Sequence, residues 1–223
     1  MHRIHYRFGF VLLLILATIT FTLAAPTGDP ARFIGVVLQG AVLVAAVIAS
    51  RAPRWLILVC VVAVLVGIVG AGAALFGTGR FGNSSAGIVA LLYVALTPIA
   101  LVFGVLRQFR ETEAVTLQTM FGVLCLYLLV GLIFGVAYAT VNDLSSTSFF
   151  NPPGTYHRDD FLYFSYTTLT TVGYGDLTAA TNLGRSLAIT EALAGQLYLV
   201  TVVAVIISNL EAVRPGRRKK TAA

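Results

Sequence analysis

Long apolar segments constrain the fold of this chain more than any other feature of its sequence. Six of them are long enough, at about 1.5 Å per helical residue, to cross the hydrocarbon layer of a membrane, and short polar stretches separate them. Their expected bounds are 8–25, 32–50, 54–76, 86–106, 114–141 and 185–210. Only 11% of the residues are charged, against about a quarter in an ordinary soluble domain. The sequence therefore predicts an all-α, multi-pass protein of the cell membrane with six transmembrane helices.

The first apolar segment has a second interpretation. A basic start, an apolar middle and small residues near Ala24 are also typical of a secretory signal peptide. The apolar run is long for a signal, however, and Pro26 would directly follow the supposed cleavage site. We therefore expect residues 1–25 to be retained and to include the first membrane helix.

The net charge of +6 is distributed as in a membrane protein, not as in a nucleic-acid-binding protein. Most basic residues fall on one side of the membrane when the N-terminus is placed in the cytoplasm. On that side lie Arg3, Arg7, Arg51, Arg54, Arg107, Arg110 and the cluster 214–220. The positive-inside rule thus predicts that both chain ends are cytoplasmic. The basic tail would either bind anionic lipid or simply anchor the last helix.

A short stretch between the last two apolar segments has a different character. Residues 159–169 are too few and too polar to span a membrane, and we expect a re-entrant half-helix capped by Asp159 or Asp160. The sequence Thr-Thr-Val-Gly-Tyr-Gly-Asp follows at 170–176. Glycine adopts positive φ freely, so glycines at alternate positions allow successive peptide groups to alternate in handedness and to point their carbonyls one way.

Four such segments around an axis would form rings of oxygen atoms that replace the water shell of a dehydrated cation. A glycine-rich turn is the simpler interpretation of 170–176. A turn, however, requires neither the amphipathic half-helix before it nor the long apolar helix after it. The context therefore favours an ion-binding segment.

From about Thr116 to Leu210 the chain resembles the pore module of a potassium channel, with an outer helix, a pore helix, a filter and an inner helix. The motif at 171–176 matches the filter of that family residue for residue. With six expected spans, the chain resembles the tetrameric six-transmembrane type, and its compactness suggests a prokaryotic source. The resemblance implies a homotetramer in the membrane that conducts K⁺ passively, with K⁺ as its permeant ion. No phosphate-binding loop or acid/base pair indicates an enzyme.

The resemblance also assigns roles to individual residues. The ion sites would be lined by backbone carbonyls and one hydroxyl, from Thr171, Val172, Gly173 and Tyr174. The filter would be supported by Thr170, Gly175, Asp176, Tyr163, Phe164, Thr167 and Glu191. In this arrangement the ring of Tyr174 turns away from the pore and packs against Tyr163 and Phe164.

One position departs from the family pattern. Some bacterial two-helix channels have a Glu in the pore helix that pairs with the Asp after the filter, and this chain has Thr167 there. That acidic pair is therefore absent, and the form of filter inactivation that depends on it is not carried over to this chain. Our hypothesis is that Tyr163 hydrogen-bonds Asp176 instead.

Two residues of the sixth apolar segment are further candidates. A carboxylate such as Glu191 is energetically costly there, so we expect it to be buried and hydrogen-bonded behind the filter, with protonation as one option. A water-facing or snorkelling side chain is the alternative. Gly195, one helical turn later, matches the flexible glycine of inner helices in the family and is our candidate gating hinge. A glycine that only permits helix packing is the alternative.

We expect three parts: a four-helix domain at 1–110, a pore domain at 111–213 and a cytoplasmic tail at 214–223. The first part resembles a voltage-sensing domain in topology only. Voltage sensing requires about three to four charges per subunit that move through the field, and 86–106 contains none. The sequence predicts weak or absent voltage dependence.

Two other functions remain open at this stage. A potassium transporter subunit would need repeated pore-like units or coupling residues, and neither is evident. A non-conducting scaffold or regulatory subunit would keep the filter-like loop without passing ions. The gating stimulus is not indicated, and it would come from the membrane, the pore, protons or a separate regulatory protein.

Overall fold

The computed structural model describes residues 7–24, 29–51, 53–76, 93, 95–107, 116–145 and 147–213, and the structural statements below concern these residues. In chain order the elements are α1 (Arg7–Ala24), α2 (Asp29–Ser50), α3 (Arg54–Phe76), α5 (Leu117–Leu144), β1 (Phe150–Asn151), α6 (Arg158–Leu169), β2 (Thr178–Ala179) and α7 (Asn182–Val213). A further apolar helix, Ala95–Arg107, lies between α3 and α5. The predicted tail 214–223 lies outside the described residues.

The described helices are those of a membrane protein. Four of them contain stretches long and apolar enough to span a bilayer, namely Arg7–Ala24, Phe33–Ser50, Leu117–Leu144 and Asn182–Val205. Two shorter apolar stretches correspond to the other two predicted segments: Arg54–Gly67 lies within 54–76, and Ala95–Arg107 overlaps 86–106 and ends one residue beyond it. The all-α character expected from the sequence is confirmed for the described residues, apart from the two-residue strands β1 and β2.

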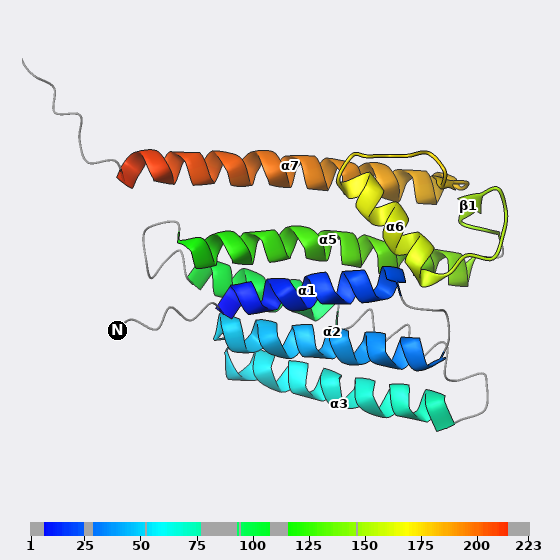
Figure 1. The fold of residues 1–223 in the computed structure, drawn as a ribbon, viewed down its shortest axis with the longest axis horizontal. Helices are drawn as coiled ribbons and strands as arrows, with labels where there is room; N and C mark the ends of the chain where they lie inside the picture. Colours follow the sequence, from blue (N-terminus) through cyan, green and yellow to red (C-terminus); the bar gives the residue numbers. More distant parts are fainter. Residues whose placement is uncertain are drawn as a thin grey trace, which may run out of the picture.

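The helices are arranged as neighbouring layers. In Figure 1, α1, α2 and α3 lie side by side below α5, and the long α7 lies on the far side of α5, with α6 inclined between α5 and α7. The backbone N–H of Phe8, at the start of α1, donates to the side-chain carbonyl of Gln118, at the start of α5, over 3.0 Å. Because their first turns are adjacent, α1 and α5 begin at the same end of the bundle.

Several basic residues gather at that end. A nitrogen of the Arg107 guanidinium lies 3.4 Å from the backbone carbonyl of Arg51. A Cβ atom added to Gly104 would lie 2.6 Å from Ser50 and 3.1 Å from the Phe8 ring, so this pair lies near the start of α1, whose first residue is Arg7. This placement is the one that the positive-inside prediction requires, since these arginines were assigned to one side of the membrane.

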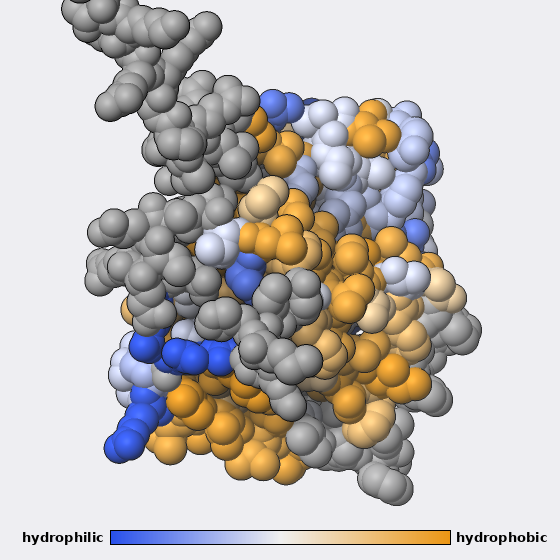
Figure 2. Space-filling model, turned by 60° about the vertical axis from the view of Figure 1, so that its left-hand side comes forward, coloured by the Kyte–Doolittle hydropathy of each residue, from blue (hydrophilic) through white to orange (hydrophobic). Residues whose placement is uncertain are grey.

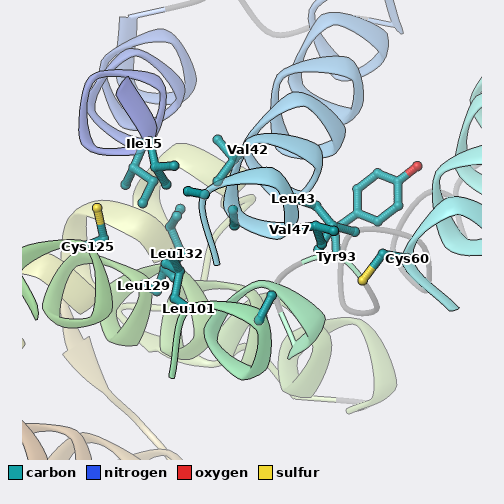
Figure 3. Packing of buried hydrophobic residues seen from close by; sticks show 14 of the residues in the cluster. Ile15, Val42, Leu43, Val47, Cys60, Tyr93, Leu101, Cys125, Leu129 and Leu132 are labelled. Carbon is teal, nitrogen blue, oxygen red and sulfur yellow. The ribbon is translucent and has the colours of Figure 1, made fainter. Parts of the chain in front are cut away.

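A single core joins the N-terminal helices to the later ones. Figure 3 shows Ile15 of α1 directed toward Leu129 and Leu132 of α5, and Leu43 and Val47 of α2 beside Tyr93. Ile15, Leu43, Leu101 and Leu129 are all essentially inaccessible to solvent. The same cluster includes Leu162 of α6. The expected domain boundary, near residue 110, lies outside the described residues, but the core includes side chains from both sides of it.

Much of the outer surface is hydrophobic. Figure 2 shows a broad apolar surface with strongly hydrophilic residues near its edge. Large exposed apolar side chains include Leu58, Leu65 and Val69 on α3 and Leu197 and Val200 on α7. Such a surface is suited to lipid or to another protein surface rather than to water.

Candidate functional site

Helix α6 is too short to cross a membrane. Its 12 residues span about 18 Å, whereas the hydrocarbon layer is about 30 Å thick. The cap differs from the expectation that Asp159 or Asp160 begins the helix. His157 is the N-cap residue, and its backbone N–H donates to the Asp160 carboxylate over 2.8 Å. Asp160 therefore acts from the third helical position, where a carboxylate also interacts favourably with the helix dipole.

Helix α6 packs closely against α5 at two glycines of α5. A Cβ atom added to Gly131 would lie 2.6 Å from the Tyr166 ring, and one added to Gly135 would lie 3.2 Å from the Cα atom of Leu162. The Tyr166 hydroxyl donates to the Leu128 carbonyl over 2.7 Å. The sequence analysis did not predict this packing contact, although two glycines four residues apart in an apolar segment are a known signal for close helix packing.

The segment after α6 has an alternating backbone. Thr171, Gly173 and Gly175 have φ values of 60°, 51° and 83°, and neither residue between them has positive φ. The alternation was expected at the two glycines. Thr171 was not expected to adopt positive φ, because a β-branched residue there is a steric outlier. Strain of this kind persists where the surrounding structure enforces it, commonly at functional sites.

Hydrogen bonds tie this segment to the end of α6. The backbone N–H of Gly173 donates to the Thr167 carbonyl over 3.1 Å, and that of Thr171 donates to the Thr168 carbonyl over 3.0 Å. The Thr170 hydroxyl donates to the Tyr166 carbonyl over 2.6 Å. The position of the segment therefore follows the position of α6.

The predicted contact between Tyr163 and Asp176 is confirmed. The Tyr163 hydroxyl donates to the Asp176 carboxylate over 3.0 Å. The Tyr163 and Tyr174 rings are stacked, with centroids 6.3 Å apart and an angle of 0° between their planes. The ring of Tyr174 is thus placed against Tyr163 as expected.

The expected position of Phe164 beside Tyr174 is not found among the described contacts of one chain. Its ring instead packs 5.2 Å from that of Tyr138 and 5.1 Å from that of Phe150. Consecutive helical residues point about 100° apart, so Tyr163 and Phe164 face different sides of α6. Phe164 belongs to an aromatic cluster beneath the β1–β2 pair, in which Phe150 lies opposite Ala179.

We expect the change Tyr163→Phe to weaken the segment 170–176 without unfolding α6, because only the hydrogen bond to Asp176 is lost while the ring contact remains. Ion flux through reconstituted protein should become less selective or decay faster, by roughly two- to tenfold, the size expected for one hydrogen bond. Tyr156→Phe is the matched control, since its hydroxyl donates to Pro152 in an exposed loop. Unchanged selectivity and decay in Tyr163→Phe would contradict a supporting role.

Glu191 of α7 is fully buried and has two hydroxyl partners. Its Oε2 accepts from the Tyr138 hydroxyl of α5 over 2.5 Å, and its Oε1 lies 2.5 Å from the Ser165 hydroxyl of α6. The expected burial and hydrogen bonding are confirmed, and the water-facing alternative is wrong in this structure. No signal in the sequence singles out Tyr138 or Ser165 as its partners.

Gly195 is a site of close packing in this structure. A Cβ atom there would lie 2.7 Å from the Leu169 side chain and 2.9 Å from the Leu169 backbone carbonyl, at the end of α6. Helix α7 is continuous from Asn182 to Val213, so the chain is not broken at this glycine. Its role as a gating hinge remains a prediction.

Residues 122–212 match the family model Ion_trans_2, whose description is "Ion channel". The match covers less than half of the chain, and it includes α6, the segment 170–176 and most of α5 and α7. Comparisons with the curated proteins and with the solved structures gave no match. Together with the apolar helices, the family match supports a membrane protein with ion channel function.

Proposed function

We propose that four copies of this chain form a K⁺-selective channel of the six-transmembrane type, through which K⁺ passes down its gradient. K⁺ would be bound by the backbone carbonyls of 171–174 and by the Thr171 hydroxyl. The observation that carries this proposal is the alternating positive φ of Thr171, Gly173 and Gly175 directly after a short helix. A backbone that alternates in this way turns successive carbonyls toward one side, as a dehydrated cation requires.

In a single chain, residues of the proposed ion-binding segment and of α7 are exposed. Val172 and Tyr174 are 52% and 72% exposed, and Leu193, Leu197 and Val200 of α7 are also exposed. Since one segment cannot surround an ion, the proposal requires closed symmetry, in which filters face each other and α7 helices meet around the axis. The negative end of the α6 dipole, at the start of the filter segment, would favour a cation nearby.

The proposed orientation places both chain ends in the cytoplasm and the filter toward the outer face of the cell membrane. It is supported by the arginines at the end of the bundle where α5 begins, since Gly131 and Gly135, which contact α6, lie in the second half of α5. The basic residues after 213 would then face anionic lipid or a separate regulatory protein.

Ion flux tests the function directly. Purified protein in liposomes should take up Rb⁺, a K⁺ surrogate, should be blocked by Ba²⁺ and should exclude Na⁺, and its mass should be that of a tetramer. A scaffold or regulatory subunit would give no uptake, and a transporter would give uptake that depends on a second ion gradient. Equal passage of Na⁺, or a monomeric assembly, would overturn the proposal.

We expect weak or no voltage dependence of the conductance. The helix Ala95–Arg107 carries its single basic residue, Arg107, at its last position, where the guanidinium donates to the Arg51 carbonyl just after α2. Too few charges would therefore cross the field to bias opening. Single-channel recording across physiological potentials measures this. A steep conductance–voltage relation would contradict the prediction, because it would require charge to cross the membrane field during opening.

A further inference from the structure

A buried chain of oxygen atoms connects three helices behind the filter segment. It runs from the Tyr138 hydroxyl to Oε2 of Glu191, from Oε1 of Glu191 to the Ser165 hydroxyl, and from that hydroxyl to the Gly131 carbonyl. The three oxygen–oxygen distances are 2.5 Å, 2.5 Å and 2.7 Å. Tyr138, Ser165 and Glu191 are all fully buried.

Three contacts of this length require three hydrogen atoms. Tyr138 supplies one, Ser165 supplies one, and the Gly131 carbonyl can only accept. If Glu191 were ionised, its Oε1 and the Gly131 carbonyl would compete for the single Ser165 hydrogen, and one contact would have none. If Glu191 is protonated on Oε1, it donates to Ser165, Ser165 donates to Gly131, and every contact is satisfied.

The surroundings of Glu191 also favour the neutral form. The titratable groups that interact electrostatically with it are Tyr127 and Tyr138 from α5 and Tyr166 from α6. None of these is a base, and no basic side chain of the described residues pairs with Glu191. A buried carboxylate without a cation is strongly disfavoured, whereas a hydrogen-bonded carboxylic acid is not.

We propose that protonated Glu191 is a positioning residue that holds α6 against α5 and α7, and that loss of its proton releases α6 and lowers conduction. Ionised Glu191 would draw the Ser165 hydrogen away from Gly131, so this hydrogen bond between α6 and α5 would be lost while the one from Tyr166 to Leu128 remains. Because the Thr167 carbonyl of α6 accepts from Gly173, a shift of α6 would be transmitted to the filter. The conduction part of this inference rests on the proposed function.

The test is the pH dependence of Rb⁺ uptake by the whole protein in liposomes. Uptake by the wild-type protein should fall at alkaline pH, by about tenfold or more per pH unit above the midpoint of the titration. Glu191→Gln should keep uptake at neutral pH and lose the alkaline fall, because an uncharged amide can donate to Ser165 and accept from Tyr138. Glu191→Leu should lose uptake at every pH.

Two further variants sharpen the assignment. Tyr138→Phe keeps the ring but removes a donor that stabilises the ionised carboxylate, so the alkaline fall should move to higher pH by about one unit. Thr190→Val is the matched control. Its hydroxyl is exposed and donates to the Ser186 carbonyl of the same helix, so its pH profile should be that of the wild type.

An infrared spectrum gives a readout that does not depend on conduction. The band of a protonated carboxylic acid should be present in the wild-type protein at neutral pH and absent from Glu191→Gln. Absence of that band from the wild type, or an unchanged alkaline fall in Glu191→Gln or Tyr138→Phe, would overturn the inference. If the infrared band is present but no protein conducts at any pH, the proposed channel function fails, and with it the effect on conduction.

Discussion

Replacing Gly173 by alanine should abolish K⁺ flux while leaving the assembled protein intact. Gly173 has a φ of 51°, and an L-residue in this region costs about 1–2 kcal/mol. In the proposed tetramer the four copies would add about 4–8 kcal/mol, which is relieved if the peptide turns its carbonyl away from the ion. We therefore expect Rb⁺ uptake in liposomes to fall by about a hundredfold or more.

Gly154→Ala is the control for this substitution. Gly154 lies in the loop before α6, and the methyl group would make only ordinary contacts, at 3.4 Å from the Tyr156 ring. In a single chain nothing lies within 4 Å of the added methyl at Gly173, so backbone conformation, not crowding within the chain, is the expected cause. Normal uptake by Gly173→Ala would show that this φ is not needed for conduction.

Replacing Gly195 by alanine should destabilise the pore. The added methyl would lie 2.9 Å from the Leu169 carbonyl, so the end of α6 or the axis of α7 would have to move. Overpacking of this kind costs about 1–3 kcal/mol, here in each subunit. Both thermal stability of the purified assembly and Rb⁺ uptake should decrease, because the displaced end of α6 leads directly into the filter.

Gly35→Ala provides the comparison. Gly35 lies within α2 with no atom within 4 Å of an added methyl, so alanine should leave stability unchanged or raise it by about 0.5–1 kcal/mol. Comparison of Gly195→Ala with Gly35→Ala also distinguishes the two roles considered for Gly195, a packing contact and a gating hinge. If Gly195 acts only as a hinge, alanine should change the open probability in single-channel records and leave the melting temperature as it is.

The sequence predicted those features of the site that depend on local chemistry. Glycines at 173 and 175 led to the alternating backbone, and the position of Glu191 in an apolar segment led to its burial. Thr171 was not predicted to adopt positive φ, because its own preference opposes that conformation. The hydrogen bond from Thr171 to Thr168 and the one from Gly173 to Thr167 show that the end of α6 contributes to the local conformation.

The errors arose where side chains meet from different elements. The family resemblance placed Phe164 beside Tyr174, whereas within one chain the orientation of α6 directs it toward Tyr138. The partners of Glu191 were missed for a similar reason, since Tyr138 and Ser165 lie 53 and 26 residues away in sequence. Pairings over such separations depend on how α5, α6 and α7 pack together.

The sequence by itself determined that apolar helices would form and where glycine would free the backbone, because segment length and side-chain sterics act within a few residues. Only the tertiary structure decided which buried polar groups lie within hydrogen-bond distance of one another and which glycines are needed for space. Gly131, Gly135 and Gly195 are such glycines. Hydrogen bonding and close packing depend on distances between helices, and those distances result from the packing of the whole bundle.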